Sequence, residues 1–400
     1  MPRVAYPLVA LASMLALAAC GAGAQAGAPT WVPAPSFNGE GQQPSAIPNV
    51  PIPSAPSSPG APNSPAPQSS SASPVDGAVV ATQLTSPNGI VILPDGSALV
   101  GERTTGRIVQ VQPQPNHPVL TVRTLTGLST RGGGGLLDLA LSPTYAQDNL
   151  IFAYITTATD NRVVDFTLNG PVTPVLTGIP IGGSDNSGRI TFGSDNQLYV
   201  GTGDAGEPSL AADSASLAGK VLRVSEIGQP ATGNPYPSSP VFASGHRDVV
   251  GLCTVPTTDL LLAVDIKGLN GRENVNVLSP GANYGWPNPS GSSKPALSSL
   301  PVAYSSPGGC AVVDGTFYVT SLDGTALLGA SLTLTGAAPK LSTFTVYLHE
   351  RYGRLLNVIA APDGALWLTT SNRDGHGKPV AADERVLRIP PPAGHSAYPG

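Results

Sequence analysis

One pattern recurs six times along this chain of 400 residues, and it restricts the possible folds more than any other feature. Each copy has a glycine-containing approach, a short apolar run, a turn with Pro, Asp or Gly, and a second apolar run. The copies are PNGIVILPDGSALVGER, GGLLDLALSPTYAQDNLIFAYIT, SGRITFGSDNQLYVGTGD, VGLCTVPTTDLLLAVD, GGCAVVDGTFYVTSLDG and LNVIAAPDGALWLTTSN. Short apolar runs bounded by turn residues indicate β-strands, and no amphipathic helical stretch stands out between them.

Aligned on the turn, the copies share one equivalent position in the first run. This anchor position is occupied by Ile90, Leu139, Ile190, Leu252, Gly309 and Val358. The anchors are 49, 51, 62, 57 and 49 residues apart, so each unit has room for the four short strands of a propeller blade. A β-sandwich does not give six such similar periods. The sequence therefore predicts an all-β fold, a six-bladed β-propeller.

Two cysteines, Cys253 and Cys310, each lie one residue beyond the anchor position in adjacent units. Inner strands of neighbouring blades run side by side, so the two thiols point in similar directions. A disulfide needs Cα atoms within about 7 Å, and it is the default for two cysteines in an exported protein. We predict a bond between Cys253 and Cys310, with two free thiols as the alternative.

The N-terminus predicts export. Arg3 precedes an apolar run over residues 4–19, and small residues lead to Cys20. A basic start, a short apolar core and small residues describe a secretory signal, and the run is short for a membrane span of about 20 residues. Leu-Ala-Ala-Cys resembles the bacterial lipobox. We predict a lipoprotein signal peptide over 1–19 and a lipid anchor at Cys20 on the extracytoplasmic side of the cell membrane; the alternative is a plain signal peptide.

The next segment has the composition of a linker. Residues 20–76 are dominated by Pro, Ser, Ala and Gly, and their only charged residues are Glu40 and Asp76. Such a chain cannot bury enough surface to offset its ordering entropy, and its prolines keep it extended. We expect a disordered stalk over 20–76, the propeller over 77–392 and a short tail over 393–400.

Charge and glycine patterning exclude two classes of ligand. Charged residues make up 11% of the chain, the net charge is −5, and no basic run occurs. Nucleic-acid binding needs clustered Lys and Arg, so nucleic acid is not an expected partner. The stretch GTGDAG is rich in glycine, but a phosphate loop requires a helix after it, and strand patterns surround this one. We expect a monomer.

Seven further motifs occur in a specific order. They are GERTTGRI, GGLLDLALSP, SGRITFGSDNQLYVGTGDAG, SLAGKVLRV, GHRDVVGL, ENVNVLSPGANYGWP and TSNRDGHG. Together they resemble the glucose/sorbosone dehydrogenase family of quinoprotein sugar dehydrogenases, over roughly residues 80–390, and that family is a six-bladed propeller. The resemblance implies pyrroloquinoline quinone (PQQ) and Ca²⁺ on one face near the axis, where a histidine takes a proton from the sugar as hydride passes to the quinone.

The catalytic positions carry over residue by residue. Asp185 stands where the family has its histidine, so the resemblance assigns it the role of base. Asp204 matches the aspartate that supports the histidine, and Arg247 matches the arginine beside the quinone. His246, next to Arg247, is either a substitute base or an ordinary surface-loop histidine.

The cofactor positions carry over less completely. Arg354 is retained and Asp248 replaces an asparagine, while Gly268 lies near the carbonyls expected to hold Ca²⁺. Asp323 replaces a lysine and Leu356 replaces a second arginine. PQQ is a tricarboxylate, and one close ion pair contributes about 4 kcal/mol at an effective dielectric constant of 20. These exchanges therefore weaken the expected binding of PQQ.

Three functions remain open, the third of them a cation-dependent lactonase, which would need several carboxylate and amide ligands converging on the axis. The first is a PQQ- and Ca²⁺-dependent aldose dehydrogenase in which Asp185 is a weaker base than histidine, because the ordinary pKa is about 3.9 for Asp and about 6.5 for His. The second is a non-catalytic propeller that binds a sugar, a cell-wall component or a protein partner at the cell surface. The family resemblance favours the first, and the charge exchanges at the cofactor positions favour the second.

Overall fold

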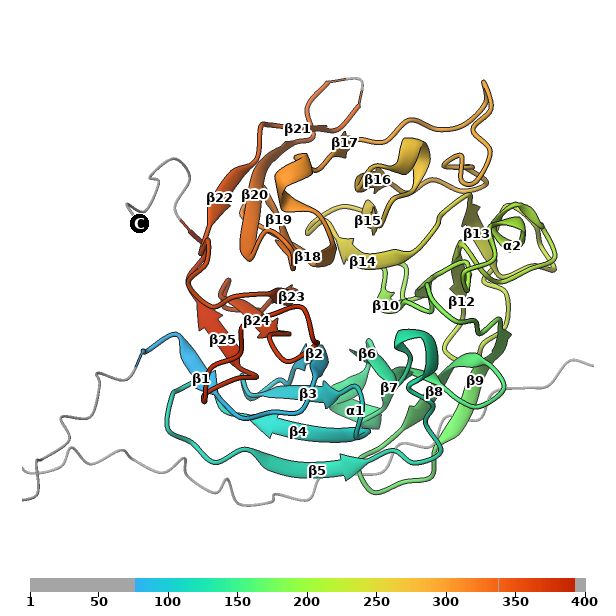
Figure 1. The fold of residues 1–400 in the computed structure, drawn as a ribbon. Coiled ribbons are helices and arrows are strands. Elements are labelled where there is room, and N and C mark those ends of the chain that lie inside the picture. Colours follow the sequence, from blue (N-terminus) through green and yellow to red (C-terminus); the bar gives the residue numbers. More distant parts are fainter. Residues whose placement is uncertain (1–75, 337, 393–400) are drawn as a thin grey trace, which may run out of the picture. The chain divides into compact units, whose positions relative to one another are not determined.

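The structure is a computed structural model that describes residues 76–336 and 338–392. Within these residues, 25 strands form six antiparallel sheets around one axis (Figure 1). The predicted six-bladed propeller is confirmed. The predicted signal peptide, the lipidation site Cys20, nearly all of the stalk and the tail lie outside the described residues.

Each blade has its strands in sequence order from the axis outward, except at the seam between the two chain ends. Blades 1 to 3 contain β2 (Pro87–Ile92), β3 (Ala98–Glu102), β4 (Arg107–Val111) and β5 (Leu120–Thr124); β6 (Leu136–Leu141), β7 (Ile151–Thr156), β8 (Asn161–Phe166) and β9 (Thr173–Ile179); and β10 (Gly188–Phe192), β11 (Leu198–Thr202), β12 (Lys220–Val224) and β13 (Val241–Ser244). Blades 4 to 6 contain β14 (Val249–Thr254), β15 (Leu261–Asp265), β16 (Asn274–Val277) and β17 (Ser298–Ser299); β18 (Pro307–Val313), β19 (Thr316–Ser321), β20 (Ala326–Thr333), β21 (Lys340–Leu341) and β22 (Thr345–Tyr347); and β23 (Leu355–Ala360), β24 (Leu366–Thr370), β25 (Val386–Ile389) and β1 (Val79–Ala81).

In residues 76–336 and 338–392, helices are few and short. They are α1 (Tyr145–Asp148), α2 (Pro208–Ala212) and the 3₁₀ turns η1 (Arg131–Gly133), η2 (Leu269–Gly271) and η3 (Val302–Tyr304). In the part of the chain that the structure describes, none of them is long and apolar enough to cross a membrane.

The anchor positions all fall on the innermost strands. All six line one cavity of about 360 Å³ on the propeller axis, here called the distal cavity. The repeat in the sequence is therefore the rotational repeat of the ring, and each apolar run supplies the inner strand of a blade.

The hydrophobic core is divided among the blade interfaces. Six clusters of buried side chains lie between successive blades, one cluster for each interface. Phe152 lies between blades 2 and 3, and Trp367 between blades 6 and 1, and both are fully buried. Because both faces of each sheet pack against a neighbour, inner strands read as continuous apolar runs rather than as an alternating pattern.

The ring is closed by strands from both ends of the described chain. Strand β1 pairs with β25, so the outermost strand of blade 6 comes from the N-terminal side. Asp76, just before β1, accepts hydrogen bonds from the Tyr352 hydroxyl at 2.8 Å and from Arg351 at 3.3 Å.

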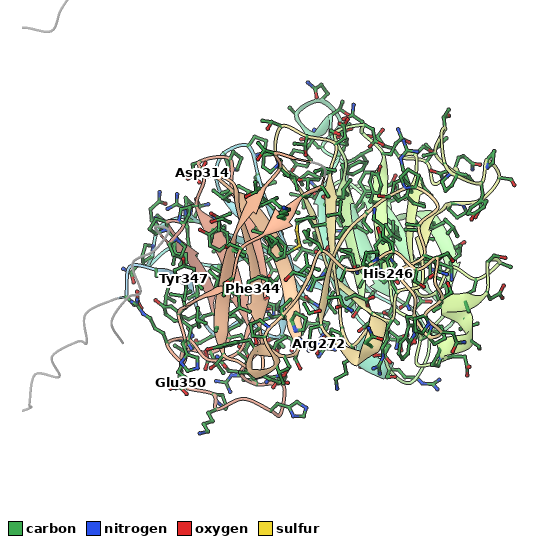
Figure 2. The ribbon with its side chains drawn as sticks, turned by 90° about the horizontal axis from the view of Figure 1, so that it is seen from above. His246, Arg272, Asp314, Phe344, Tyr347 and Glu350 are labelled. Carbon is green, nitrogen blue, oxygen red and sulfur yellow. A yellow bond between two sulfur atoms is a disulfide. The ribbon has the colours of Figure 1, made fainter. Side chains whose placement is uncertain are left out.

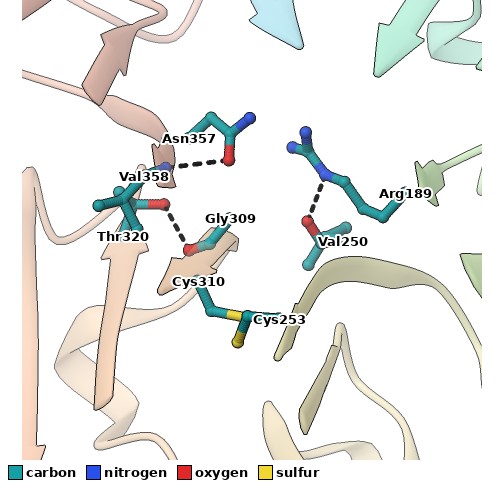
Figure 3. The surroundings of a disulfide bond; sticks show 8 residues. All are labelled: Arg189, Val250, Cys253, Gly309, Cys310, Thr320, Asn357 and Val358. Carbon is teal, nitrogen blue, oxygen red and sulfur yellow. Dashed lines mark hydrogen bonds between the residues drawn. A yellow bond between two sulfur atoms is a disulfide. The ribbon is translucent and has the colours of Figure 1, made fainter. Parts of the chain in front are cut away.

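The disulfide prediction is confirmed. Cys253 in β14 and Cys310 in β18 are bonded, with their Cα atoms 5.8 Å apart. The bond joins the inner strands of blades 4 and 5 near the axis (Figure 3).

The two ends of the propeller carry different connections. Turns between the first and second strands of the blades lie at one end, which includes Asp314. Loops between second and third strands and between blades lie at the other end, which includes Arg272 and Glu350 (Figure 2). This second end, here called the site face, also carries the loops with Asp185, Asp204 and Arg247.

Candidate functional site

A second cavity, here called the mouth cavity, opens around the axis at the site face. It has a volume of about 310 Å³. The residues two positions before the anchors all line it: Asn88, Leu137, Gly188, Val250, Pro307 and Leu356. In five of the six blades the inner strand has a β-bulge or register shift at this point. A bulge bends the strand and redirects side chains, which accounts for this ring of residues at the mouth.

One layer deeper, polar side chains separate the mouth cavity from the distal cavity. Arg189 lines both cavities and is 7% exposed. Its Nε donates to the Val250 carbonyl at 2.6 Å, and its Nη1 lies 3.6 Å from the carboxylate of Asp138 (Figure 3 shows the first contact). Burial raises the pKa of Asp138, partly offset by Arg189. Arg189 therefore lies between the two cavities, and the carboxylate of Asp138 balances its charge.

The predicted catalytic residues gather at the site face, but they contact different partners. Asp185 lines the mouth cavity, and its carboxylate lies 3.6 Å from Arg247. The Arg247 guanidinium lies 5.2 Å from the centre of the Trp286 ring. Asp204 is buried and accepts hydrogen bonds from Trp286 Nε1 at 2.9 Å and Gly206 N–H at 2.8 Å. In the described chain, Asp204 thus supports Trp286 directly and makes no hydrogen bond to Asp185.

Asp248 behaves as a neutral group. It lines the mouth cavity, and its two carboxyl oxygens face the backbone N–H and the hydroxyl of Ser187, at 3.2 and 2.9 Å. Burial, reinforced by the nearby charge of Asp185, raises the pKa of Asp248 to about 8. A protonated aspartic acid has nearly the shape of asparagine, so Asp248 preserves much of the chemistry of the residue it replaces.

The retained cofactor arginine is already occupied by carboxylates. Arg354 Nη1 donates to Asp323 at 2.8 Å, and Arg354 Nε donates to Asp374 at 2.8 Å. Burial alone would raise the pKa of Asp323, but hydrogen bonds from Ser306 and Arg354 lower it below its usual value. One guanidinium therefore pairs with two carboxyl groups.

The metal position also departs from the expected arrangement. Gly268 lies on the site face, and a Cβ there would come within 2.6 Å of an Asp265 carboxylate oxygen. The neighbouring Lys267 N–H donates to Glu273 at 2.9 Å. Among the described residues, no three His, Cys, Asp or Glu side chains are grouped so that they could hold a metal ion.

His246 fits neither of its expected roles. Its side chain is 0% exposed, its ring stacks on Tyr284 with the ring centres 4.7 Å apart, and it does not line the mouth cavity. Its Nδ1 lies 3.3 Å from an Asp265 oxygen. Asp265 also accepts hydrogen bonds from the backbone of Arg247 and Asp248, so His246 packs behind the loop that presents those two residues.

Several residues of the site were not singled out from the sequence. Arg103 lines the mouth cavity and donates to the carbonyls of Gly133 and Gly134, at 3.2 and 3.1 Å. Asn88 also lines it, is 7% exposed, and has no hydrogen bond from its side chain among the described residues. Three of these residues lie within the motifs quoted above, and that membership could have identified them: Arg103, Asp374 and Trp286. The sequence marks Asn88 only by its position two residues before an anchor.

The residues present do not fit PQQ. Arg354 would have to release Asp323 and Asp374, and Arg247 would have to release Asp185, before either could bind a cofactor carboxylate. Leu356 offers no charge at the position of the second arginine. At these positions a tricarboxylate would therefore meet aspartates in place of unpaired cations, and Arg103, which hydrogen-bonds to carbonyls, stands outside them. Like charges at such distances repel by several kcal/mol before screening.

Solved structures of quinoprotein sugar dehydrogenases share this fold. The chain is 37% identical to the PQQ-bound aldose sugar dehydrogenase of Streptomyces coelicolor, with a TM-score of 0.73 over 78% of this chain and 96% of that one. It is also 37% identical to a Thermus thermophilus oxidoreductase described as a glucose dehydrogenase, with a TM-score of 0.71 over 78% of this chain and 98% of that one.

Sequence comparison gives the same relationship. The chain is 29% identical over 258 residues to quinoprotein glucose dehydrogenase B of Acinetobacter calcoaceticus, a match that covers 54% of this chain and 53% of that protein. The chain thus spans about half the length of the curated relatives it matches. Residues 84–380 match the family described as Glucose / Sorbosone dehydrogenase. The chain is a propeller of the PQQ-dependent aldose sugar dehydrogenase type and belongs to the glucose/sorbosone dehydrogenase family.

Proposed function

We propose that this protein binds a neutral sugar in the mouth cavity and does not oxidise it. The observation that carries this proposal is the pairing of Arg354 with both Asp323 and Asp374. With Arg247 paired to Asp185 and Arg189 to Asp138, three cationic groups of the site are already neutralised from within. A neutral ligand needs no counter-charge, so it can bind without breaking these pairs.

The walls of the mouth cavity suit a sugar ring. Its lining combines apolar side chains with polar groups, and both kinds come from several blades. The apolar ones include Leu137, Ile266, Pro307, Leu322 and Leu356, and the polar ones include Asn88, Arg103, Asp185, Ser187, Asp248, Ser371 and Asp374. A sugar ring has apolar C–H surfaces and a rim of hydroxyl groups. Cavities that bind small molecules combine apolar walls with a few placed polar groups in this way.

The rival function is aldose oxidation, which the similarity to the Streptomyces coelicolor enzyme favours. The deciding experiment adds PQQ and Ca²⁺ to the purified propeller, follows quinone binding, and measures dye reduction across a panel of aldoses. Calorimetry with the same aldoses measures binding without turnover. We expect sugar binding, no saturable PQQ binding at micromolar concentration, and no dye reduction. Rapid dye reduction by one aldose would contradict the proposal that the protein does not oxidise the sugar.

The sequence also supports a location for this activity. We propose that the protein is exported and held by a lipid on Cys20, with residues 20–76 as a spacer between the membrane and the propeller. The basic start, apolar core and Leu-Ala-Ala-Cys motif support this proposal. Metabolic labelling with a radioactive fatty acid tests it. The label should enter the wild-type protein and be absent from Cys20→Ala, and equal labelling of both would contradict the assignment.

A further inference from the structure

The distal cavity lies at the end of the propeller opposite the site face. The inner strands run from the site face toward this end, and the cavity is lined mainly by the anchors and the residues that follow them. Five of the six anchors bear branched aliphatic side chains that are at most 9% exposed: Ile90, Leu139, Ile190, Leu252 and Val358. None of the catalytic or cofactor positions carried over from the family lines this cavity.

The walls of the distal cavity favour an apolar occupant over water. The volume of about 360 Å³ falls within the range of about 300–1,000 Å³ that is usual for pockets that bind small molecules. A buried water needs about two to four polar partners, and the aliphatic anchors offer none. Ile92, Leu141 and Phe192 are partly buried at the ends of their strands, so the apolar surface continues to the opening.

Three polar side chains form the inner end of the distal cavity. Arg189 of blade 3 and Asn357 of blade 6 come from opposite sides of the ring, and Figure 3 shows the two side chains directed toward each other. Asp138 of blade 2 lies beside Arg189. The Asn357 amide is already engaged, since its nitrogen donates to the Asn88 carbonyl at 3.0 Å and its oxygen accepts from the Val358 N–H at 2.9 Å.

The unmet hydrogen-bonding capacity of this polar layer lies on Arg189. The residue is 7% exposed, and its Nε donates to the Val250 carbonyl at 2.6 Å. Its Nη1 is buried and has no hydrogen-bond partner among the described residues. A buried donor without a partner is costly, and a guanidinium has only donors. A ligand that satisfies Nη1 must therefore present an acceptor oxygen.

The charge of the polar layer selects against ions. Among the described residues, Asp138 and Arg189 are the only charged ones that line the distal cavity. One Asp138 oxygen lies 3.6 Å from Arg189 Nη1, and the other accepts from the Ile190 N–H at 2.9 Å. The two charges balance, so an ionic head group would enter an apolar cavity without a counter-charge of its own. Burial of such an ion is costly, whereas a neutral oxygen avoids that cost.

We propose that the distal cavity binds a small neutral molecule with an apolar body and an acceptor oxygen at one end, such as a medium-chain ketone, ester or alcohol. The apolar body lies against the anchors, and the oxygen accepts a hydrogen bond from Arg189 Nη1. This site lies at the opposite end of the ring from the mouth cavity, and it does not depend on the function proposed there.

The test uses three probes of equal chain length and different head groups: methyl hexyl ketone, octanoate and octylammonium. Calorimetry measures the Kd of each probe for the wild type and three variants. Ala360→Trp fills the opening from an exposed position at the end of β23, and Ala146→Trp is the matched control at an exposed alanine of α1, at the same end but outside the cavity. Asp138→Asn keeps an acceptor for the Ile190 N–H and removes the counter-charge of Arg189. Thermal unfolding of each variant checks that the fold is intact.

We expect the ketone to bind the wild type at least about tenfold more tightly than either ion. Ala360→Trp should weaken ketone binding about tenfold or more, and Ala146→Trp should change it by less than about twofold. In Asp138→Asn, octanoate should gain at least about tenfold relative to the ketone, because the charge of Arg189 is then unbalanced.

The proposal fails if none of the three probes binds the wild type, or if ketone binding survives Ala360→Trp unchanged. Tighter binding of either ion than of the ketone would overturn the assignment of a neutral ligand. An unchanged order of affinities in Asp138→Asn would overturn the role of Arg189 in holding the oxygen.

Discussion

At the scale of single residues, the site shows how neighbours decide the charge of an aspartate. Asp248 and Asp323 both replace residues that the family resemblance leads one to expect, and they respond in opposite directions. Burial beside another carboxylate raises the pKa of Asp248 to about 8, whereas hydrogen bonds from Ser306 and Arg354 outweigh the effect of burial and lower that of Asp323. The pKa of the same side chain is therefore raised in one position and lowered in the other.

The sequence identified several of these residues but not their partners. It assigned Asp185 and Asp248 to the site, and both line the mouth cavity. It assigned Arg354 and Asp323 to cofactor positions without predicting that the two form an ion pair. It did not predict that Asp374 would share Arg354, because the two residues come from different loops that meet only in the folded ring. It also did not predict the burial of His246, since a single histidine in a polar motif has no periodic signal.

The first prediction concerns pH. The folded pKa of Asp248 is about 8, well above its unfolded value of about 3.9. The neutral acid therefore favours the folded state fully below about pH 4, and this contribution is lost as pH rises through about 8. Asp248→Asn keeps a neutral group at every pH. Its free energy of unfolding should exceed that of the wild type by about 1 kcal/mol or more at about pH 8, measured by urea denaturation.

The comparison well below about pH 4 serves as the control, because both side chains are then neutral in both states. There the two proteins should be of similar stability. Parallel stability curves across the whole pH range would contradict the assignment of Asp248 as a neutral group.

The second prediction restores cations at the cofactor positions. Asp323→Lys combined with Leu356→Arg removes one carboxylate from Arg354 and adds two positive charges near the mouth cavity. One ion pair contributes up to about 4 kcal/mol at an effective dielectric constant of 20. After screening, we expect PQQ to bind at least about tenfold more tightly than to the wild type, measured by fluorescence titration.

A variant at the other end of the propeller tests whether added charge acts at long range. Asp363 is an exposed aspartate in the turn between β23 and β24, at the opposite end of the propeller, and it pairs with Arg388 of β25. The control variant is Asp363→Lys. It should leave the affinity for PQQ unchanged. An equal gain in the control would show that the added charge acts at long range and not at the site.

At the scale of elements, the inner strands present three successive layers of residues to the axis. The anchors line the distal cavity, the residues just before them include Asp138, Arg189 and Asn357, and the residues two before them line the mouth cavity. The anchors could be predicted because the turn after them is regular. The other layers depend on β-bulges, which shift the register within each strand and leave no clear mark in a single sequence.

The third prediction concerns a glycine of the middle layer. In β18, a Cβ on Gly308 would lie 1.7 Å from the carbonyl oxygen of Leu356 in the neighbouring blade. Backbone cannot move away without separating the inner strands of blades 5 and 6. Gly308→Ala should therefore lower the free energy of unfolding by about 2–4 kcal/mol, measured by chemical denaturation.

Gly291 supplies the control for this substitution. A Cβ at Gly291 would meet no atom within 4 Å. Gly291→Ala should change stability by less than about 0.5 kcal/mol. A similar loss in both variants would mean that close approach of the inner strands is not what requires glycine at position 308.

At the scale of the whole molecule, the number of blades followed from the sequence but the closure of the ring did not. Six copies of one pattern predict six blades, because each unit must bury its faces against its neighbours. Strand β1 has only three residues and no partner in its own repeat, so no pattern in the sequence predicts it. Its place in blade 6 is set by pairing with β25, more than 300 residues away in the chain.

The fourth prediction concerns the disulfide between blades 4 and 5. Cys253 and Cys310 are separated by 57 residues, and closing a loop of this size stabilises a fold by about 2–4 kcal/mol, mainly by restricting the unfolded chain. Cys253→Ser with Cys310→Ser should lower the free energy of unfolding by that amount while sugar binding persists, because the apolar cluster between these blades remains. The stability of the double variant should not respond to dithiothreitol, whereas that of the wild type should fall; an unchanged wild type would contradict the prediction.

The seam in blade 6 determines how this ring carries mechanical load. A pull on the chain ahead of Asp76 first reaches the contacts of that residue with Tyr352 and Arg351, and then the short pairing of β1 with β25. The Asp76 contacts therefore bear the load before it reaches the pairing of β1 with β25. If they yield, force acts on β1 and opens the ring at its seam, while the disulfide holds blades 4 and 5 together elsewhere in the ring. Under such a pull, the pairing of β1 with β25 is thus the first strand contact of the ring to bear the load.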